Sequence, residues 1–351
     1  MSQYKNLSLF IILTIFVSCQ KDDSIPEGKG NKNEVSVTDP SLSGPTKASA
    51  ALVVISSDGD AITEKGICWS LSTTPTLESS GTWSNIPATG SSTVNMLDLI
   101  PGQRYYYRTY AKTIKSTIYG AEKSFVFPAD NSTLKNGLVA YYPFNGNYLD
   151  YSGSGNNLQG NASLITGRKG LRNSAYSFNG LSDYLSVVNP KNLSSGNSGY
   201  TISFWFNAPK WVINSMLVGY GKSWVTSQAN YVKSSNYFAP SYNKTLQSLT
   251  HYHWNNDFND FWGYTNDIIN TWKNVVITFD GTILRYYSDG TLIRSGGPAR
   301  VDVVPNILSI AARIETPPTS NIKEFFNGNI DDVRIYNRAL TPVEVTSLTN
   351  Y

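Results

Sequence analysis

Short apolar segments separated by turn-forming residues run through most of this chain, and they limit what it can fold into. Segments such as "SAALVVI" (49–55), "EKGICWS" (64–70) and "YYYRTYAKT" (105–113) recur at intervals of roughly eight to twelve residues, as in antiparallel sandwiches. The one convincing helix signal is "TPVEVTSL" (341–348), with a threonine N-cap, a proline at the first helical position and a glutamate that completes a capping box. The sequence therefore predicts an all-β protein with a short C-terminal helix.

Length and composition narrow the function classes. The chain has 351 residues, of which 13% are aromatic and only 15% charged, a length and composition that suit two globular β-rich domains. Its formal net charge is +3, and the basic residues are scattered. This is too weak a positive field for a nucleic-acid-binding surface, so we exclude nucleic acid as a partner.

The N-terminal residues read as a targeting segment. Lys5 precedes an apolar stretch, "LSLFIILTIFV" (7–17), that is too short for a stable membrane span. The following "VSC" ends on Cys19, which predicts a lipoprotein signal peptide at 1–18 and lipidation of Cys19. The alternative is an ordinary secretion signal cleaved at another small residue.

Residues 19–33 predict a flexible tether, because they are rich in charge, Pro, Gly and Asn and nearly lack apolar side chains. The string "CQKDDS" (19–24) resembles the acidic export signal of surface lipoproteins from Bacteroidota. That resemblance implies a lipid-anchored protein on the outer face of the outer membrane.

Cys68 is the only other cysteine, so a chain lipidated at Cys19 has no partner for an intramolecular disulfide. We expect Cys68 to be a small buried hydrophobe rather than a nucleophile, because His251 and His253 both fall in a different predicted domain. Those two histidines stand without a Gly-x-Ser-x-Gly motif or a nearby third metal ligand, and we interpret them as ordinary strand residues.

Residues 34–128 form the first predicted module, with further strands expected at 92–99 and 122–127. Within it, "LIPGQRYYYRTYA" (99–111) resembles the Leu-x-Pro-Gly-x-x-Tyr corner of fibronectin type III domains, in which a tyrosine fixes the turn into the next strand. The resemblance implies a fibronectin type III-like sandwich that acts as a spacer. Residues 129–136 are a predicted linker that could either hinge or pack.

Residues 137–351 form the second predicted module. They contain "GLVAYYPFNGNYLDYSGSGNNLQG", "AYSFNGLSDYLSV", "YTISFWFNA", "TWKNVVITFDGTILRYYSDGTLI" and "FNGNIDDVRIYNRAL" in that order. These strings resemble the laminin-G-like branch of the concanavalin A-like lectin/glucanase superfamily, which implies a jelly-roll sandwich of two curved antiparallel sheets. Independently, "SDGT" (288–291) predicts a hairpin turn between two strands.

The carboxylates argue against hydrolysis. Glycosidases use paired carboxylates, and this module contains only Glu315, Glu324 and Glu344. Glu344 belongs to the helix cap, and the other two are nine residues apart. Asp257 and Asp260 are the best remaining candidates, although solvated loop aspartates explain them more simply. We therefore predict that the protein is not an enzyme.

Sugar binding is better supported by the residues. The stretch 220–264 is rich in Trp, Tyr, Asn and Asp, which are side chains that stack on pyranose rings and bond their hydroxyls. The alternative is that these aromatics pack the two sheets together. The predicted carbohydrate contacts are Trp224, Tyr237, Tyr242, Trp262 and Tyr264.

Asp331 and Asp332 stand side by side in "NGNIDDVRIYNRAL" (327–340). Strand alternation places them on opposite faces, which argues against a catalytic pair. Asp332 then shares a face with Arg334 and should form a surface ion pair with it.

Laminarinase-like relatives hold a structural cation near this strand. By resemblance its ligands here would be Asp331 and the main-chain carbonyls of Pro143 and Gly180, and calcium suits such oxygen ligands. The alternative is that Asp331 caps main-chain amides of the first strand without an ion.

The sequence thus predicts a surface-anchored, non-catalytic lipoprotein that binds the glycans of polysaccharides or glycoproteins through its laminin-G-like module. The first alternative is a protein-binding adhesin or structural cell-surface component, and the second is a glycoside hydrolase. The ligand, the oligomeric state and the orientation of the two modules stay open.

Overall fold

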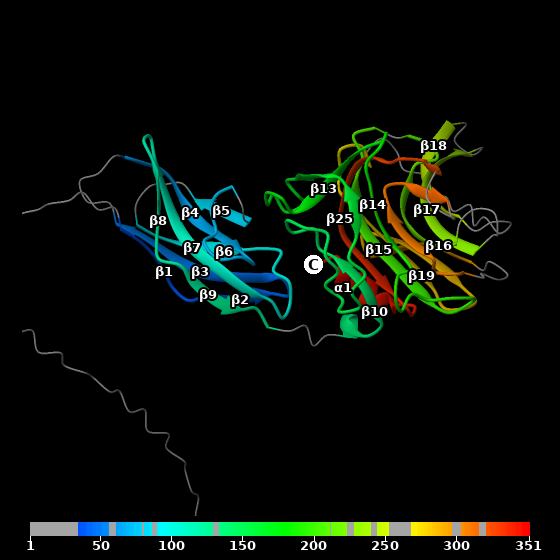
Figure 1. The fold of residues 1–351 in the computed structure, drawn as a ribbon, viewed down its shortest axis with the longest axis horizontal. Coiled ribbons are helices and arrows are strands. Elements are labelled where there is room, and N and C mark those ends of the chain that lie inside the picture. The colour runs from blue at the N-terminus through cyan, green and yellow to red at the C-terminus, as the bar shows by residue number, and fades with distance from the viewer. Residues whose placement is uncertain are drawn as a thin grey trace, which may run out of the picture.

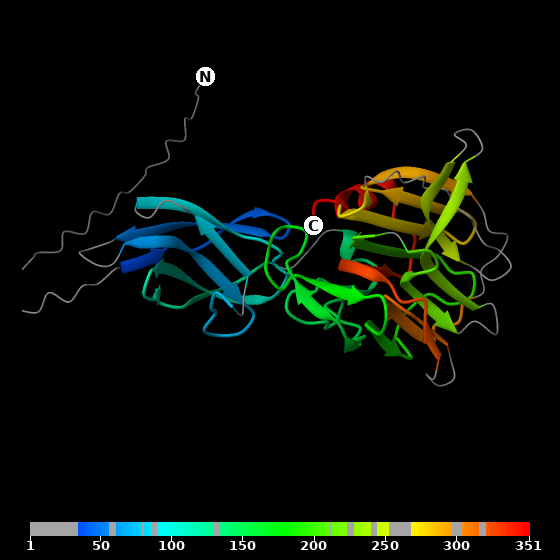
Figure 2. The same cartoon turned by 90° about the horizontal axis from the view of Figure 1, so that it is seen from above.

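The computed structural model describes residues 34–55, 61–78, 81–85, 90–128, 133–210, 212–222, 228–239, 244–252, 268–296, 303–315 and 321–351. These residues form two β-sandwiches that lie end to end along the long axis of the molecule (Figure 1). The view from above keeps the two sandwiches apart and places the C-terminal residue between them (Figure 2). The prediction of a nearly all-β fold with one short helix is confirmed.

The first sandwich consists of two antiparallel sheets that face each other across an apolar core. In one sheet, β3 is central and pairs with the other three strands, namely β3 (Lys47–Ile55), β1 (Glu34–Val37), β2 (Ser41–Gly44) and β6 (Gly90–Met96). The other sheet follows the order β5 (Gly81–Asn85), β4 (Ile62–Ser70), β7 (Arg104–Thr113) and β8 (Thr117–Tyr119), with β9 (Lys123–Val126) also beside β7.

A buried tyrosine fixes the entry into β7. The backbone N–H of Ile100 donates a 2.9 Å hydrogen bond to the hydroxyl of Tyr105, and Gly102 supplies the left-handed turn between them with φ +80°. This is the contact that the Leu-x-Pro-Gly-x-x-Tyr string predicts. The assignment to the fibronectin type III class stays a prediction.

Cys68 is fully buried in β4. Burial raises the pKa of its thiol to about 11, because the thiolate would have to form away from water. This environment agrees with the prediction of a small, unreactive core residue.

The second sandwich has the two-sheet arrangement of a jelly roll (Figure 1). One sheet follows the order β12 (Ser163–Ile165), β13 (Ala175–Asn179), β25 (Asn327–Tyr336), β15 (Tyr200–Asn207), β19 (Lys273–Phe279), β20 (Leu284–Ser288) and β21 (Thr291–Gly296), with β10 (Leu138–Tyr142) also beside β25. The other follows β11 (Gln159–Asn161), β14 (Tyr184–Val188), β22 (Ile307–Ile310), β16 (Met216–Lys222), β17 (Gln228–Ala239) and β18 (Lys244–Tyr252).

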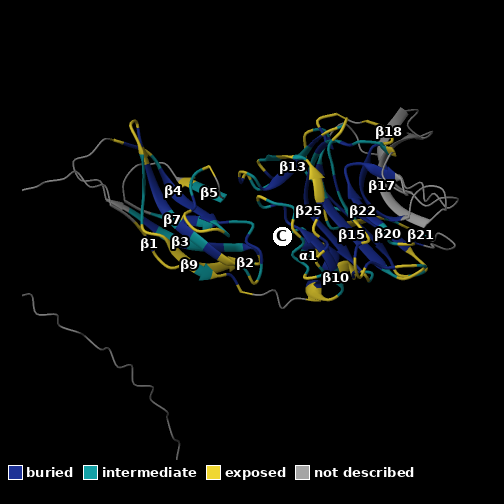
Figure 3. Cartoon of the chain, viewed as in Figure 1, coloured by how far each residue is buried: buried dark blue, intermediate teal, exposed yellow. Residues whose placement is uncertain are grey.

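The core of the second sandwich lies between these sheets, where Figure 3 shows the buried strands. Alternate residues of β15, including Ile202, Phe204 and Phe206, are fully buried against the opposite sheet. Burying each such side chain stabilises the fold by about 1.5–3 kcal/mol. A separate hairpin, β23 (Arg313–Glu315) with β24 (Asn321–Lys323), extends from the end of β22.

A short helix covers the outer face of the first of these sheets. In α1 (Pro342–Leu348), Thr341 and Glu344 form the predicted capping box, and the helix packs on Val276, Tyr287 and Tyr336. A 3-10 turn, η1 (Thr133–Lys135), leads into β10. The predicted hairpin turn joins β20 to β21. No helix within the described ranges is long and apolar enough to cross a membrane.

Candidate functional site

A β-bulge in β25 changes how the two adjacent aspartates point. Ser203 of β15 pairs with Arg334, but Trp205 pairs with Asp331, so one residue of β15 faces two residues of β25. Asp332 takes the left-handed conformation, with φ +48°. A bulge interrupts the alternation of side chains. The prediction that Asp331 and Asp332 point to opposite faces is therefore wrong, because it assumed a regular strand.

Both carboxylates contact one guanidinium. Arg168 Nε lies 3.3 Å from Asp331 Oδ2, and Arg168 Nη2 lies 3.0 Å from Asp332 Oδ2. The same Nη2 donates a 2.6 Å hydrogen bond to the main-chain oxygen of Tyr351. The guanidinium also lies over the ring of Trp205, 4.6 Å from its centroid. Arg168 thus supplies one positive charge shared by the two carboxyl groups, while its apolar face stays covered.

A second arginine completes the network. Arg334 Nε donates to Asp332 Oδ1 at 2.8 Å, and its guanidinium lies 4.3 Å from the ring centroids of both Tyr141 and Tyr351. The predicted ion pair between Asp332 and Arg334 is confirmed, but its predicted place on the surface is wrong. Asp332 is 7% exposed and Arg334 4% exposed.

The two carboxyls have unequal environments. Burial raises the pKa of Asp331 well above its usual range, with Arg168 opposing the shift. Burial would also raise the pKa of Asp332, but Arg334 and Arg168 together hold it below its usual range. Such unequal carboxyls occur in acid–base catalysis, but these two are covered and already paired. The adjoining cavity has a volume of about 10 Å³, which is room for about one water molecule.

The structure brings together two of the three predicted calcium ligands. Asp331 and Pro143 line the same small cavity. Gly180 instead follows the end of β13, where its neighbour Asn179 pairs with Asn327 of β25. Asp331 lies four residues further along β25 than Asn327, which is about 13 Å along the strand. Gly180 therefore lies apart from the other two positions along the sheet.

Arg168 supplies the positive charge beside Asp331. Among the residues that the structure describes, no group of three or more His, Cys, Asp or Glu side chains is placed to hold a metal. Calcium binding stays a prediction from the resemblance.

Most of the predicted carbohydrate contacts lie outside the described residues, namely Trp224, Tyr242, Trp262 and Tyr264. Tyr237 is in β17, where its backbone pairs with Leu246. The structure describes the backbone of Tyr237 but not its side chain. These five positions stay predictions. Tyr220, at the start of that aromatic stretch, is a core residue, because it is fully buried and its ring meets Tyr200 edge-on.

Two glutamates of the second module are paired with arginines. Glu324 forms a 2.8 Å ion pair with the buried Arg313, and Glu344 binds Arg338 at 2.7 Å in addition to its capping role. Cys19, Asp257, Asp260 and His253 lie outside the described residues, and Glu315 and His251 are described by their backbone in β23 and β18.

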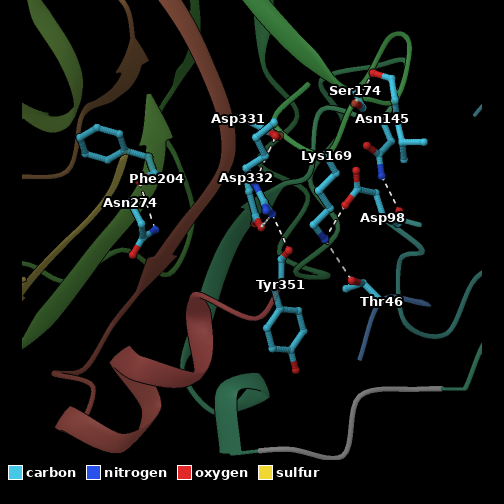
Figure 4. Close-up of polar contacts among 12 residues, drawn as sticks. Thr46, Asp98, Asn145, Lys169, Ser174, Phe204, Asn274, Asp331, Asp332 and Tyr351 are labelled. Carbon is cyan, nitrogen blue, oxygen red and sulfur yellow. Dashed lines mark hydrogen bonds and ion pairs between the residues drawn. The ribbon is translucent and has the colours of Figure 1, made fainter. Parts of the chain in front are cut away.

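Arg168 belongs to a loop between β12 and β13 that contacts both modules. We call residues 166–174 the junction loop. Lys169, the next residue, points to the first module and forms a 2.6 Å ion pair with Asp98, and its Nζ lies 3.3 Å from Thr46 Oγ1. Figure 4 shows Lys169 between Asp98 and Thr46 on one side and the aspartate pair on the other. Sequence reasoning missed this role.

An apolar contact reinforces the junction. Leu171 belongs to the second module by sequence, yet it is 4% exposed and packs in the core of the first. Asn145, which follows β10, donates a 2.6 Å hydrogen bond from Nδ2 to the main-chain oxygen of Asp98. The junction loop therefore docks the two modules through charge, hydrogen bonding and apolar burial.

Comparison with protein families places the second module. Residues 151–346 match the Laminin_G_3 family, described as the concanavalin A-like lectin/glucanases superfamily. The match spans more than half of the chain, and the chain belongs to this family. A comparison with curated proteins found no significant match.

Comparison with solved structures found similar chains of low sequence identity. Domain 4 of an extracellular arabinanase from Geobacillus stearothermophilus, in complex with arabinotriose, is 21% identical with a TM-score of 0.43, over 60% of this chain and 98% of that one. The binding domain of botulinum neurotoxin DC is 17% identical with a TM-score of 0.46, over 62% of this chain and 51% of that one. The binding domain of Paraclostridial Mosquitocidal Protein 1 is 20% identical with a TM-score of 0.40, over 62% and 53%. This chain therefore spans about half the length of the two toxin binding domains.

The first prediction concerns the counter-charge of the aspartate pair. We expect Arg168→Ala to lower the free energy of unfolding by about 3–5 kcal/mol, because removing one partner leaves the buried Asp331 without its counter-charge. Denaturant unfolding would measure the change. The matched control is Arg172→Ala in the same loop, because Arg172 is exposed and should cost no more than about 0.5 kcal/mol. Equal effects of the two substitutions would contradict the assigned role of Arg168.

The second prediction concerns the cation. We expect the melting temperature to be the same with a calcium chelator and with added calcium, because Arg168 already supplies positive charge at Asp331. Calorimetric melting would measure it. A melting temperature that rises with calcium and falls on chelation would instead support the metal site implied by the resemblance, since a ligand that binds only the folded state stabilises it.

Proposed function

We propose that this protein is a surface-anchored, non-catalytic lipoprotein that binds the glycans of polysaccharides or glycoproteins through residues 137–351. The observation that carries the proposal is family membership, because residues 151–346 match the concanavalin A-like lectin/glucanases superfamily. That superfamily name covers lectins as well as glucanases, so the choice between binding and hydrolysis depends on the carboxylates.

The described glutamates support binding. Glycoside hydrolysis needs two carboxyl groups facing each other across a substrate. Glu324 is held by Arg313, and Glu344 is held by Arg338 and the helix cap. Asp331 and Asp332 are buried against two arginines. None of these four carboxylates is available to a polysaccharide in this arrangement.

The junction supports a spacer role for residues 34–128. A spacer keeps a binding module at a fixed distance only if the two do not hinge freely. Here the ion pair of Lys169 with Asp98 is mostly buried, with 22% and 13% of the two side chains exposed, and Leu171 is packed in the first core. The first module thus holds the second in a defined orientation.

The third prediction tests glycan binding. We expect the chain without residues 1–19 to retain one family of polysaccharides or glycans on a glycan array, and Trp224→Ala combined with Trp262→Ala to abolish the signal. Stacking on each aromatic ring contributes apolar contact that alanine cannot supply. The control is Tyr106→Ala in the spacer module, which should bind as the parent does.

Two other outcomes would redirect the proposal. Retention of a single protein from a pull-down, with no glycan retained on the array, would favour the adhesin alternative. Turnover of any polysaccharide by the purified chain would contradict the non-catalytic assignment.

The fourth prediction tests the anchor. Expressed in a bacterium that processes lipoproteins, the chain should incorporate a labelled fatty acid and sediment with membranes, whereas Cys19→Ser should do neither. Acyl chains anchor a protein because each buried methylene contributes about 0.8 kcal/mol. Cys68→Ser is the matched control and should keep the label. A parent chain that remains unlabelled and is secreted would contradict lipidation.

A further inference from the structure

A pocket opens where the two modules meet, separate from the aromatic stretch at 220–264. It has a volume of about 210 Å³ and is lined by residues of both modules, among them Trp69 and Ser72 from the first and Asn145 and Arg172 from the second. Pockets for drug-sized ligands hold about 300–1,000 Å³. This one is therefore suited to a single sugar unit rather than to an extended oligosaccharide.

Arg172 gives the pocket a positive charge. Its side chain is exposed, and within the described part of the chain it has neither an ion pair nor a hydrogen bond. The other charged residue at the pocket, Asp98, is already neutralised by Lys169 at 2.6 Å. An unpaired guanidinium presents a planar fork of donors that matches a carboxylate. The pocket thus favours an anionic group.

Asn145 adds an acceptor at the same wall. Its Nδ2 donates to the main-chain oxygen of Asp98, which fixes the direction of the amide. Its Oδ1 is buried and has no hydrogen-bond partner in the described structure. A buried acceptor without a donor is unfavourable, so a ligand that brings a hydroxyl group to this wall gains a partner there.

The accessible wall of the pocket is polar. Ser72 and Arg172 are exposed there, and Asn147 and Asn173 are partly exposed, whereas Trp69 and Leu171 behind them are each only 4% exposed. Hydroxyl and amide groups of this kind orient a polar ligand, so the pocket matches the hydroxyl-bearing edge of a sugar ring.

We propose that this junction pocket binds one sugar unit that carries a carboxylate, with Arg172 pairing with the carboxylate and Asn145 accepting from a ring hydroxyl. The inference rests on the proposed glycan-binding function and adds a site and a ligand class to it. Because both modules supply the walls, the site exists only while the junction loop keeps them docked.

The fifth prediction tests this site with glucuronate, matched against glucose, by titration calorimetry on the chain without residues 1–19. We expect glucuronate to bind and glucose to bind at least about tenfold more weakly, since each tenfold step corresponds to the loss of one good charge-assisted contact. Arg172→Ala should weaken glucuronate binding at least about tenfold, and Arg172→Lys should restore only part of it because lysine lacks the fork. Lys210→Ala is the control, because it removes one exposed positive charge outside the pocket.

The outcomes separate this inference from the proposed function. Glucuronate binding that is unchanged in Arg172→Ala would overturn the placement, and so would a glycan array that retains only neutral glycans, while either result leaves glycan binding intact. Loss of glucuronate binding in the Trp224 and Trp262 double variant, with Arg172→Ala unaffected, would also overturn it. A chain that binds no sugar in either assay would overturn both proposals.

Discussion

Two carboxyl groups are buried side by side in β25, and they require positive charge close to them. An ionised group removed from water is costly unless opposite charge lies next to it. Arg334 provides part of that charge from the same strand, and Arg168 provides the rest from the junction loop. Because Arg168 is held in place, the positions of the residues that follow it in the junction loop are constrained. Lys169 and Leu171 then face the first module, and the arrangement of the two modules follows from the ion network of the second.

The bulge at Asp332 explains why strand alternation gave a wrong answer here. Alternation is reliable when each residue of a strand has one partner, and the apolar residues of β15 obey it. In β25 two residues face one, so the side chains of Asp331 and Asp332 reach the same guanidinium. Nothing in "NGNIDDVRIY" marks the bulge, because a bulge depends on how the neighbouring strand is paired. The conclusion against a catalytic pair still holds, but burial and pairing now support it instead of alternation.

Local signals predicted local structure well. The turn before β7, the hairpin after β20 and the capping box of α1 each depend on a few adjacent residues, and each occurs where the sequence indicates. The junction could not be predicted in this way, because Arg168 and Asp332 are 164 positions apart. A weaker signal was present, since two aspartates in an apolar final strand require more positive charge than Arg334 supplies. This imbalance of charge indicates that another basic residue pairs with the aspartates, but it does not indicate which one.

The shared guanidinium also has an evolutionary consequence. Arg168, Arg334, Asp331 and Asp332 form one connected set of buried charges, so a substitution at any of them leaves another buried charge uncompensated. Single-step change at these positions is therefore disfavoured, whereas loss of the whole set, with apolar replacements, is tolerable for the second module by itself. Such a loss would free the junction loop and with it the contacts to Asp98 and Thr46. Descendants of this chain would accordingly inherit the orientation of the two modules as a single trait, kept or discarded together with this set of charges.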